Sequence, residues 1–184
     1  VREALQKLAR EGLIQSIPRF GYLVTPITVA DVSEIFELRA ILECATVRLA
    51  AVRATHSQLD LLDKLADCTY VFKDRASYSE FLSHNREFHL ELAIASGNRR
   101  LVEAISQSLD QLNRVFHLGL DLRDSAEEMR RDHLALVEAL KKRDPALAEA
   151  CIRDEILRSR ERVLEAISRY PNIPQGDLYA EHAR

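Results

Sequence analysis

Four polar residues on three predicted helices could together bind a divalent metal ion. Asn85 and His89 lie four residues apart in a helical stretch, so both side chains point from one face of that helix. His133 and Glu155 each lie among apolar residues of two later helices. Burying these groups would be costly unless they share a proton, a charge or a metal. Imidazole and oxygen ligands suit Zn, Ni, Mn or Fe in the divalent state. The alternative is that each residue is hydrogen-bonded separately in the core.

Other kinds of site find less support in the sequence. A carboxylate-bridged di-metal oxidase needs Glu-x-x-His on two helices. Glu does not stand three residues before any of the five histidines in the helical region: His56, His84, His89, His117 and His133. No nucleophile-elbow motif or glycine-rich phosphate loop occurs either. Two alternatives stay open: a mononuclear metal enzyme that uses the same pocket, and a helical interaction module without a ligand.

The composition indicates a helical protein with one ordinary domain and a small appendage. The chain has 184 residues, of which 47% are apolar and 30% charged, and only five are Gly and five Pro. No uninterrupted apolar stretch approaches about 18 residues, so we expect no membrane span. Cys44, Cys68 and Cys151 are widely spaced and form no CxxC pair, which is typical of the reduced thiols of a cytoplasmic protein.

The apolar periodicity predicts an all-α antiparallel bundle of six or more helices. We expect helices at about 29–54, 57–73, 77–97, 99–119, 125–143 and 144–170. Ser77 and Ser125 are each followed three residues later by Glu, which predicts two capping boxes, and Asp144-Pro145 predicts a helix start. For the first of these helices, we predict an apolar stripe of Val32, Ile35, Phe36, Ile41, Leu42, Ala45 and Leu49.

Residues 1–26 form a basic appendage on an acidic body. They hold four basic and two acidic side chains, a balance of +2, which leaves −5 for the remainder of a chain whose net charge is −3. Residues 1–11 have a helical pattern, and two short β-prone runs flank the turn-forming segment 18–21. A helix followed by a hairpin with a basic tip is typical of the rear half of a winged helix, and its charge favours an anionic partner.

Five segments resemble GntR-type bacterial transcription regulators of the FadR-like group, whose effector domain is called FCD. The recognition helix and wing are matched by VREALQKLAREGLI and RFGYLVTPI. The opening helix of the FCD domain is matched by VADVSEIFELRAILECATVRLAA. Its metal-binding helix is matched by HNREFHLELAIASGN, and its closing helix pair by RRDHLALVEALKKRDPALAEACIRDEI.

The resemblance implies a metabolite-responsive, homodimeric DNA-binding regulator and not an enzyme. Its helical domain would sense a small organic acid, often at one divalent metal held by Asp or Asn and three His. Asn85, His89 and His133 match the first three ligand positions, whereas the fourth falls on Glu155, a departure that leaves the identity of the metal open. Arg39 matches an arginine that often faces the effector in this family.

The resemblance also implies three segments with different roles. Residues 1–26 would be the C-terminal part of a winged helix-turn-helix domain, 27–171 the effector-binding and dimerisation domain, and 172–184 a tail. Arg2 would begin the recognition helix and Arg19 would lie at the wing tip, both suited to contacts with operator DNA. Because a winged helix has two further helices ahead of Val1, we expect this chain alone to bind DNA poorly.

Overall fold

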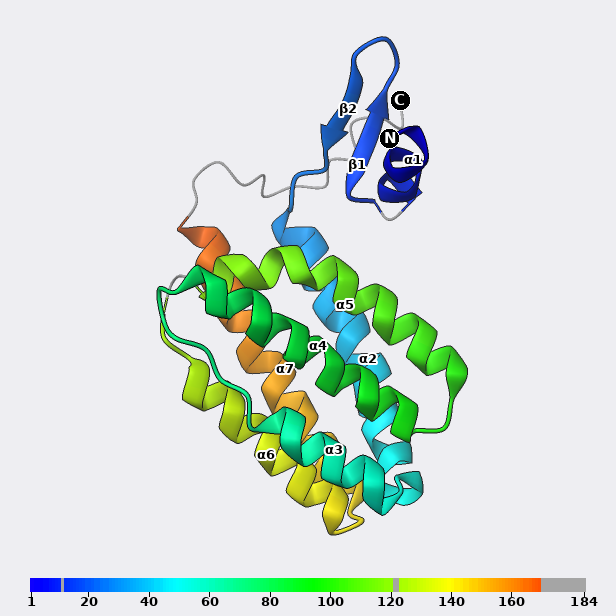
Figure 1. Ribbon diagram of the computed structural model, residues 1–184, viewed down its shortest axis with the longest axis vertical. Coiled ribbons are helices and arrows are strands. Elements are labelled where there is room, and N and C mark those ends of the chain that lie inside the picture. Colours follow the sequence, from blue (N-terminus) through cyan, green and yellow to red (C-terminus); the bar gives the residue numbers. More distant parts are fainter. Residues whose placement is uncertain (11, 121–122, 170–184) are drawn as a thin grey trace.

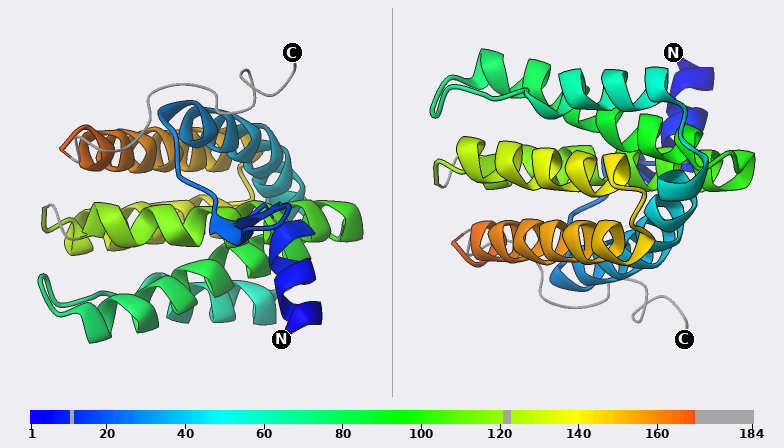
Figure 2. Two further views of the ribbon diagram at one scale, coloured as in Figure 1. Left: turned by 90° about the horizontal axis from the view of Figure 1, so that it is seen from above. Right: turned by 90° about the horizontal axis from the view of Figure 1, so that it is seen from below.

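Six helices form an antiparallel bundle, as predicted. The computed structural model describes residues 1–10, 12–120 and 123–169. The bundle consists of α2 (Val29–Arg53), α3 (His56–Ala66), α4 (Arg75–Ala95), α5 (Arg99–Leu120), α6 (Ala126–Lys141) and α7 (Pro145–Ser168). The two longest helices, α2 and α7, pack along each other, and α6 lies between α7 and the α3–α4 pair (Figures 1 and 2). Four of these helices, α2, α4, α6 and α7, carry the residues of the predicted site.

A helix and a hairpin precede the bundle. They are α1 (Arg2–Arg10), β1 (Ile14–Ile17) and β2 (Gly21–Val24), and the two strands pair antiparallel. Within the described residues, α1 packs only on β1, and none of its side chains is buried. The helix and hairpin project beyond one end of the bundle (Figure 1). This is the helix-and-hairpin arrangement that the sequence predicts for residues 1–26.

Two helix starts follow the expected chemistry. At α2, the Thr28 hydroxyl accepts a hydrogen bond from the Asp31 N–H, and the Asp31 carboxylate accepts one from the Thr28 N–H. At α7, the Asp144 carboxylate accepts hydrogen bonds from the first turn, with Pro145 as the first helical residue. These caps satisfy N–H groups that have no partner within the helix.

Both predicted serine capping boxes are wrong. Helix α4 begins two residues earlier than expected, with Asp74 as its N-cap, and the Ser77 hydroxyl donates backward to the carbonyl oxygens of Val71 and Asp74. Ser125 caps α6 without a side-chain bond. Its Oγ lies 3.2 Å from the hydroxyl of buried Tyr70, which also accepts the Ser125 N–H. Helix α3 ends at Ala66, earlier than the predicted end near residue 73.

The predicted apolar stripe of α2 is partly wrong. Ile41 is 65% exposed and Ala45 is also exposed, whereas Arg39 and Glu43 are buried. The inward face consists of residues spaced three or four apart: Val32, Phe36, Arg39, Glu43, Val47 and Ala50. The bundle thus buries two charged side chains in place of two apolar ones.

Two further observations concern the extent of the chain. None of the described helices is long and apolar enough to span a membrane. The predicted tail, residues 172–184, lies outside the described residues.

Candidate metal centre

Three of the four predicted ligands meet in the interior of the bundle. Helix α4 supplies His89, α6 supplies His133 and α7 supplies Glu155, and one ligand atom from each lies within 4.8 Å of the other two. Their exposed fractions are 1%, 2% and 4%. Asn85 is also buried, one turn before His89 on α4. Residues that are distant in the sequence thus converge because their helices present these positions inward.

Aromatic packing fixes the two imidazole rings. The ring of Phe88 stacks on His133 with centroids 4.2 Å apart and an interplanar angle of 23°. The rings of His89 and His133 lie edge to face, with centroids 5.4 Å apart. Rings held in this way lose little further freedom when they coordinate a ligand, which is the property of a preorganised site.

Arg39 reaches the same place from α2. Its Nη2 lies 2.9 Å from Nε2 of His89 and donates to Oε1 of Glu155 at 3.2 Å. The sequence predicted that Arg39 faces the effector. In the structure, its guanidinium group contacts two of the candidate metal ligands.

Glu43 is a member of the cluster that the sequence analysis missed. Its Oε1 accepts from Nε of Arg39 at 2.5 Å, and its Oε2 lies 2.9 Å from Nδ1 of His89. The signal was present in the sequence, because Glu43 follows Arg39 by four residues on the inward face of α2. We refer to Arg39, Glu43, His89 and Glu155 as the buried charge cluster.

The members of the buried charge cluster control one another's ionisation. Burial disfavours the imidazolium form of His89, but the charges of Glu43 and Glu155 outweigh it and raise the His89 pKa to about 9. Burial also disfavours the carboxylate of Glu155, yet His89 and His133 bring its pKa well below the ordinary value. Arg39 and His89 likewise lower the pKa of Glu43 against the effect of burial.

The donor set fits a divalent metal ion. Three buried atoms of the site, Oε2 of Glu43, Nε2 of His133 and Oε2 of Glu155, have no hydrogen-bond partner in the described part of the chain. The carboxylate of Glu43 beside Nδ1 of His89 leaves Nε2 to face the other ligands, which is the usual arrangement behind a metal-binding histidine. A cation at this place would take over the contacts that Nη2 of Arg39 makes with His89 and Glu155.

The predicted DNA contacts lie far from this centre. Arg2 is exposed at the start of α1, and Arg19 is exposed in the turn of the hairpin, where its φ is 68°. Both therefore belong to the segment that projects from the bundle.

Comparison with known proteins gives consistent results. The family model described as the FCD domain matches residues 34–158. The HTH-type transcriptional repressor RspR of Escherichia coli is 30% identical over 163 residues, which cover 89% of this chain and 72% of that protein. The HTH-type transcriptional regulator YdhC of Bacillus subtilis is 30% identical over 152 residues, covering 81% and 67%. Among solved structures, E. coli McbR/YncC has a TM-score of 0.75 at 23% identity and covers 92% of this chain and 84% of that one.

The buried charge cluster predicts a large effect of a small substitution. In Glu43→Gln, Arg39 and His89 lose a buried anionic partner while the side-chain shape is retained. We expect the free energy of unfolding to fall by about 3 kcal/mol or more, measured by urea denaturation. Glu149→Gln is the control, because Glu149 pairs with Arg48 and Arg153 at the surface and should matter little. Equal effects of the two substitutions would contradict the prediction.

Proposed function

Because the chain belongs to the GntR-type transcription regulators that carry an FCD domain, we propose that its helical domain binds a small organic acid at a divalent metal ion and thereby modulates binding to operator DNA. The convergence of His89, His133 and Glu155 carries the proposal. The protein acts as a homodimer in the cytoplasm, and the helix and hairpin of residues 1–26 belong to its winged DNA-binding domain.

The charges of the proposed ligands favour an acidic effector. Asn85, His89 and His133 would coordinate as neutral groups, so a 2+ ion with Glu155 retains a formal charge of +1. Four protein ligands leave one or two positions open on a five- or six-coordinate ion, and a carboxylate suits them. Zn, Ni, Mn and Fe are all compatible with this donor set. Once the ion replaces Nη2 of Arg39 at His89 and Glu155, that N–H group is available for a charge-assisted bond to the acid.

The link to DNA runs through α2. This helix carries Arg39 and Glu43, and only four residues separate its start from the end of the second hairpin strand. A change in the position of α2 on effector binding would therefore be passed to the hairpin through a very short connection. In a dimer, such a change would alter the spacing of the two recognition helices relative to the operator half-sites.

An exposed apolar row supports the proposed homodimer. On the outer face of α2, Leu38 is 44% exposed, Ile41 is 65% exposed and Val52 is 70% exposed. Their spacing places them along one side of the helix, opposite the buried charge cluster. A two-fold interface on this face would bury them and would bring the two copies of α2 together.

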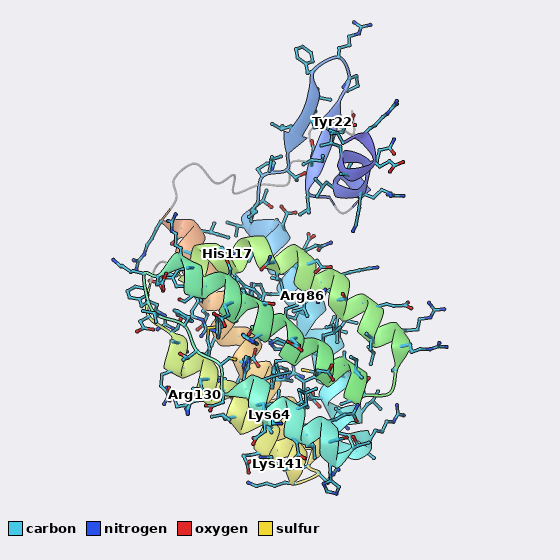
Figure 3. The ribbon with its side chains drawn as sticks, viewed as in Figure 1. Tyr22, Lys64, Arg86, His117, Arg130 and Lys141 are labelled. Carbon is cyan, nitrogen blue, oxygen red and sulfur yellow. The ribbon has the colours of Figure 1, made fainter. Side chains whose placement is uncertain are left out.

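Removal of one proposed ligand tests the metal centre. In His133→Ala, we expect metal affinity to fall by about a hundredfold or more and the binding of organic acids to fall with it. Metal content is measured by elemental analysis, and acid binding by calorimetry on the metal-loaded protein. His117→Ala is the control, because His117 is exposed on α5 near the hairpin end of the bundle (Figure 3). Full metal retention in His133→Ala would contradict the proposed centre, and acid binding without metal would assign the metal a structural role.

Arg2 provides the test of DNA binding. In a chain extended by the two leading helices of a complete winged helix, Arg2→Ala should weaken operator binding by roughly 1–3 kcal/mol if Arg2 reads a base. If it contacts phosphate only, the loss should be similar on operator and random DNA. Fluorescence anisotropy with both DNAs measures the difference, and unchanged operator affinity would remove Arg2 from the interface.

Ile41 provides the test of the dimer. Ile41→Glu introduces a charge into the exposed apolar row, and we expect the dimer to dissociate into monomers of about 21.0 kDa at micromolar concentration in analytical ultracentrifugation. Val71→Glu, at a residue that is 64% exposed outside the row, is the matched control and should remain dimeric. A dimer that persists in Ile41→Glu would place the interface elsewhere.

A further inference from the structure

A second polar group lies inside the bundle, further along α7 from the metal centre. Glu155, Ser159 and Arg162 follow one another at spacings of four and three residues, and each is at least 93% buried. All three therefore occupy the inward face of the same helix. The rise of an α-helix separates the Cα atoms of Glu155 and Arg162 by about 10 Å.

Arg162 is a buried cation with incomplete pairing. Its side chain is 6% exposed, and Nη1 donates to Oε1 of Glu128 at 3.1 Å. Nη2 is buried and has no hydrogen-bond partner among the described residues. A buried guanidinium N–H without an acceptor costs free energy, and burial accordingly lowers the Arg162 pKa.

The surrounding ion pairs do not supply the missing anion. Glu128 also accepts from Arg123 at 2.9 Å and lies 3.9 Å from Arg158, which is itself paired with Asp132. The ion pairs join three arginines to two carboxylates, and the nearby charge of Glu155 also acts on Arg162. Arg162 is the most buried of these arginines, and its direct ion pair is with Glu128 alone.

A small, mostly apolar space lies beside Arg162. Ser125, Ser159 and Arg162 line this space together with apolar side chains that include Leu82, Phe116 and Met129. Its volume is about 20 Å³, which is room for one water molecule or one carboxylate oxygen. A larger anion would enter only if the neighbouring helices moved apart.

The two buried arginines, Arg39 and Arg162, differ in the number of carboxylates to which they donate. Arg39 already donates to Glu43 and Glu155. Arg162 donates to one shared carboxylate and retains a buried N–H group without an acceptor. A ligand anion would therefore be stabilised more by Arg162 than by Arg39, which already donates to two carboxylates.

We propose that Arg162 binds a second anionic group of the effector, so that the domain recognises a dicarboxylate rather than a monocarboxylate. The inference rests on the proposed function, in which the first carboxylate lies at the metal ion. The second carboxylate places one oxygen in the space beside Ser159 and Arg162 and completes the pairing of the guanidinium group.

Matched acids and matched arginine variants test the proposal. Calorimetry compares succinate, glutarate and adipate with the monocarboxylates of equal length, butyrate, valerate and hexanoate, on the metal-loaded protein. We expect at least one dicarboxylate to bind about tenfold or more tightly than its monocarboxylate partner. In Arg162→Gln this preference should disappear, whereas metal content and monocarboxylate affinity stay unchanged. Arg158→Gln is the control, because Arg158 belongs to the same network but is 39% exposed, and it should keep the preference.

The possible outcomes separate this inference from the proposed function. A dicarboxylate preference that survives in Arg162→Gln, or a wild-type protein that binds both kinds of acid equally, would overturn the role of Arg162 while leaving the metal centre intact. A preference that depends on Arg162 but persists in metal-free His133→Ala would support the inference and overturn the metal as the first anchor. No binding of either kind of acid would overturn both. If Arg162→Gln does not fold, Arg162→Lys retains the charge without the forked donors and should still reduce the preference.

Discussion

The bundle depends on the pairing of charges that it buries. Arg39 joins α2 to α7 through Glu155, and Glu43 pairs with Arg39 and joins α2 to α4 through His89. Removal of any one partner would leave a charge in the interior without compensation. The three helices must therefore meet in one register, and this requirement specifies the interior more strictly than apolar packing alone would.

The same charges connect metal binding to the position of α2. Glu43 and Glu155 raise the His89 pKa to about 9, so a proton on His89 and the guanidinium group of Arg39 both occupy positions beside these carboxylates that a metal ion would need. In the proposed metal-bound state, His89 would have released its proton and Nη2 of Arg39 would have left His89 and Glu155. Because Arg39 is part of α2 and α2 continues into the hairpin connection, a metal-bound acid would act on the helix that leads to the DNA-binding segment. No long pathway through the bundle is needed.

The sequence predicted the helices better than it predicted their inner surfaces. Apolar periodicity and the Asp144-Pro145 signal located six helices because local propensity and capping chemistry dominate there. The box at Ser125 was wrong because its backbone and side chain both engage Tyr70, which is 55 residues away, and no local rule contains that contact. The box at Ser77 was wrong because Asp74 caps α4 and the Ser77 hydroxyl bonds backward to the chain before the helix. Ile41 was predicted to lie in the core and Glu43 was overlooked because hydropathy favours burial of isoleucine and exposure of glutamate. In the structure, α2 instead turns Arg39 and Glu43 inward toward charged residues of other helices.

Burial of the polar residues Glu155, Ser159 and Arg162 along α7 costs free energy, and the stability of the fold does not explain why they are there. A bundle of this size could close over apolar residues at positions 155, 159 and 162, and buried ion pairs are often no more stable than such a core. Here Glu155 and Arg162 instead each keep one buried atom without a partner in the described structure. These two atoms differ in chemistry, since one is a carboxylate oxygen that suits a cation and the other is a guanidinium N–H that suits an anion. Their presence on one helix face, two turns apart, is consistent with the proposed site for a metal ion and an acid with two carboxylates.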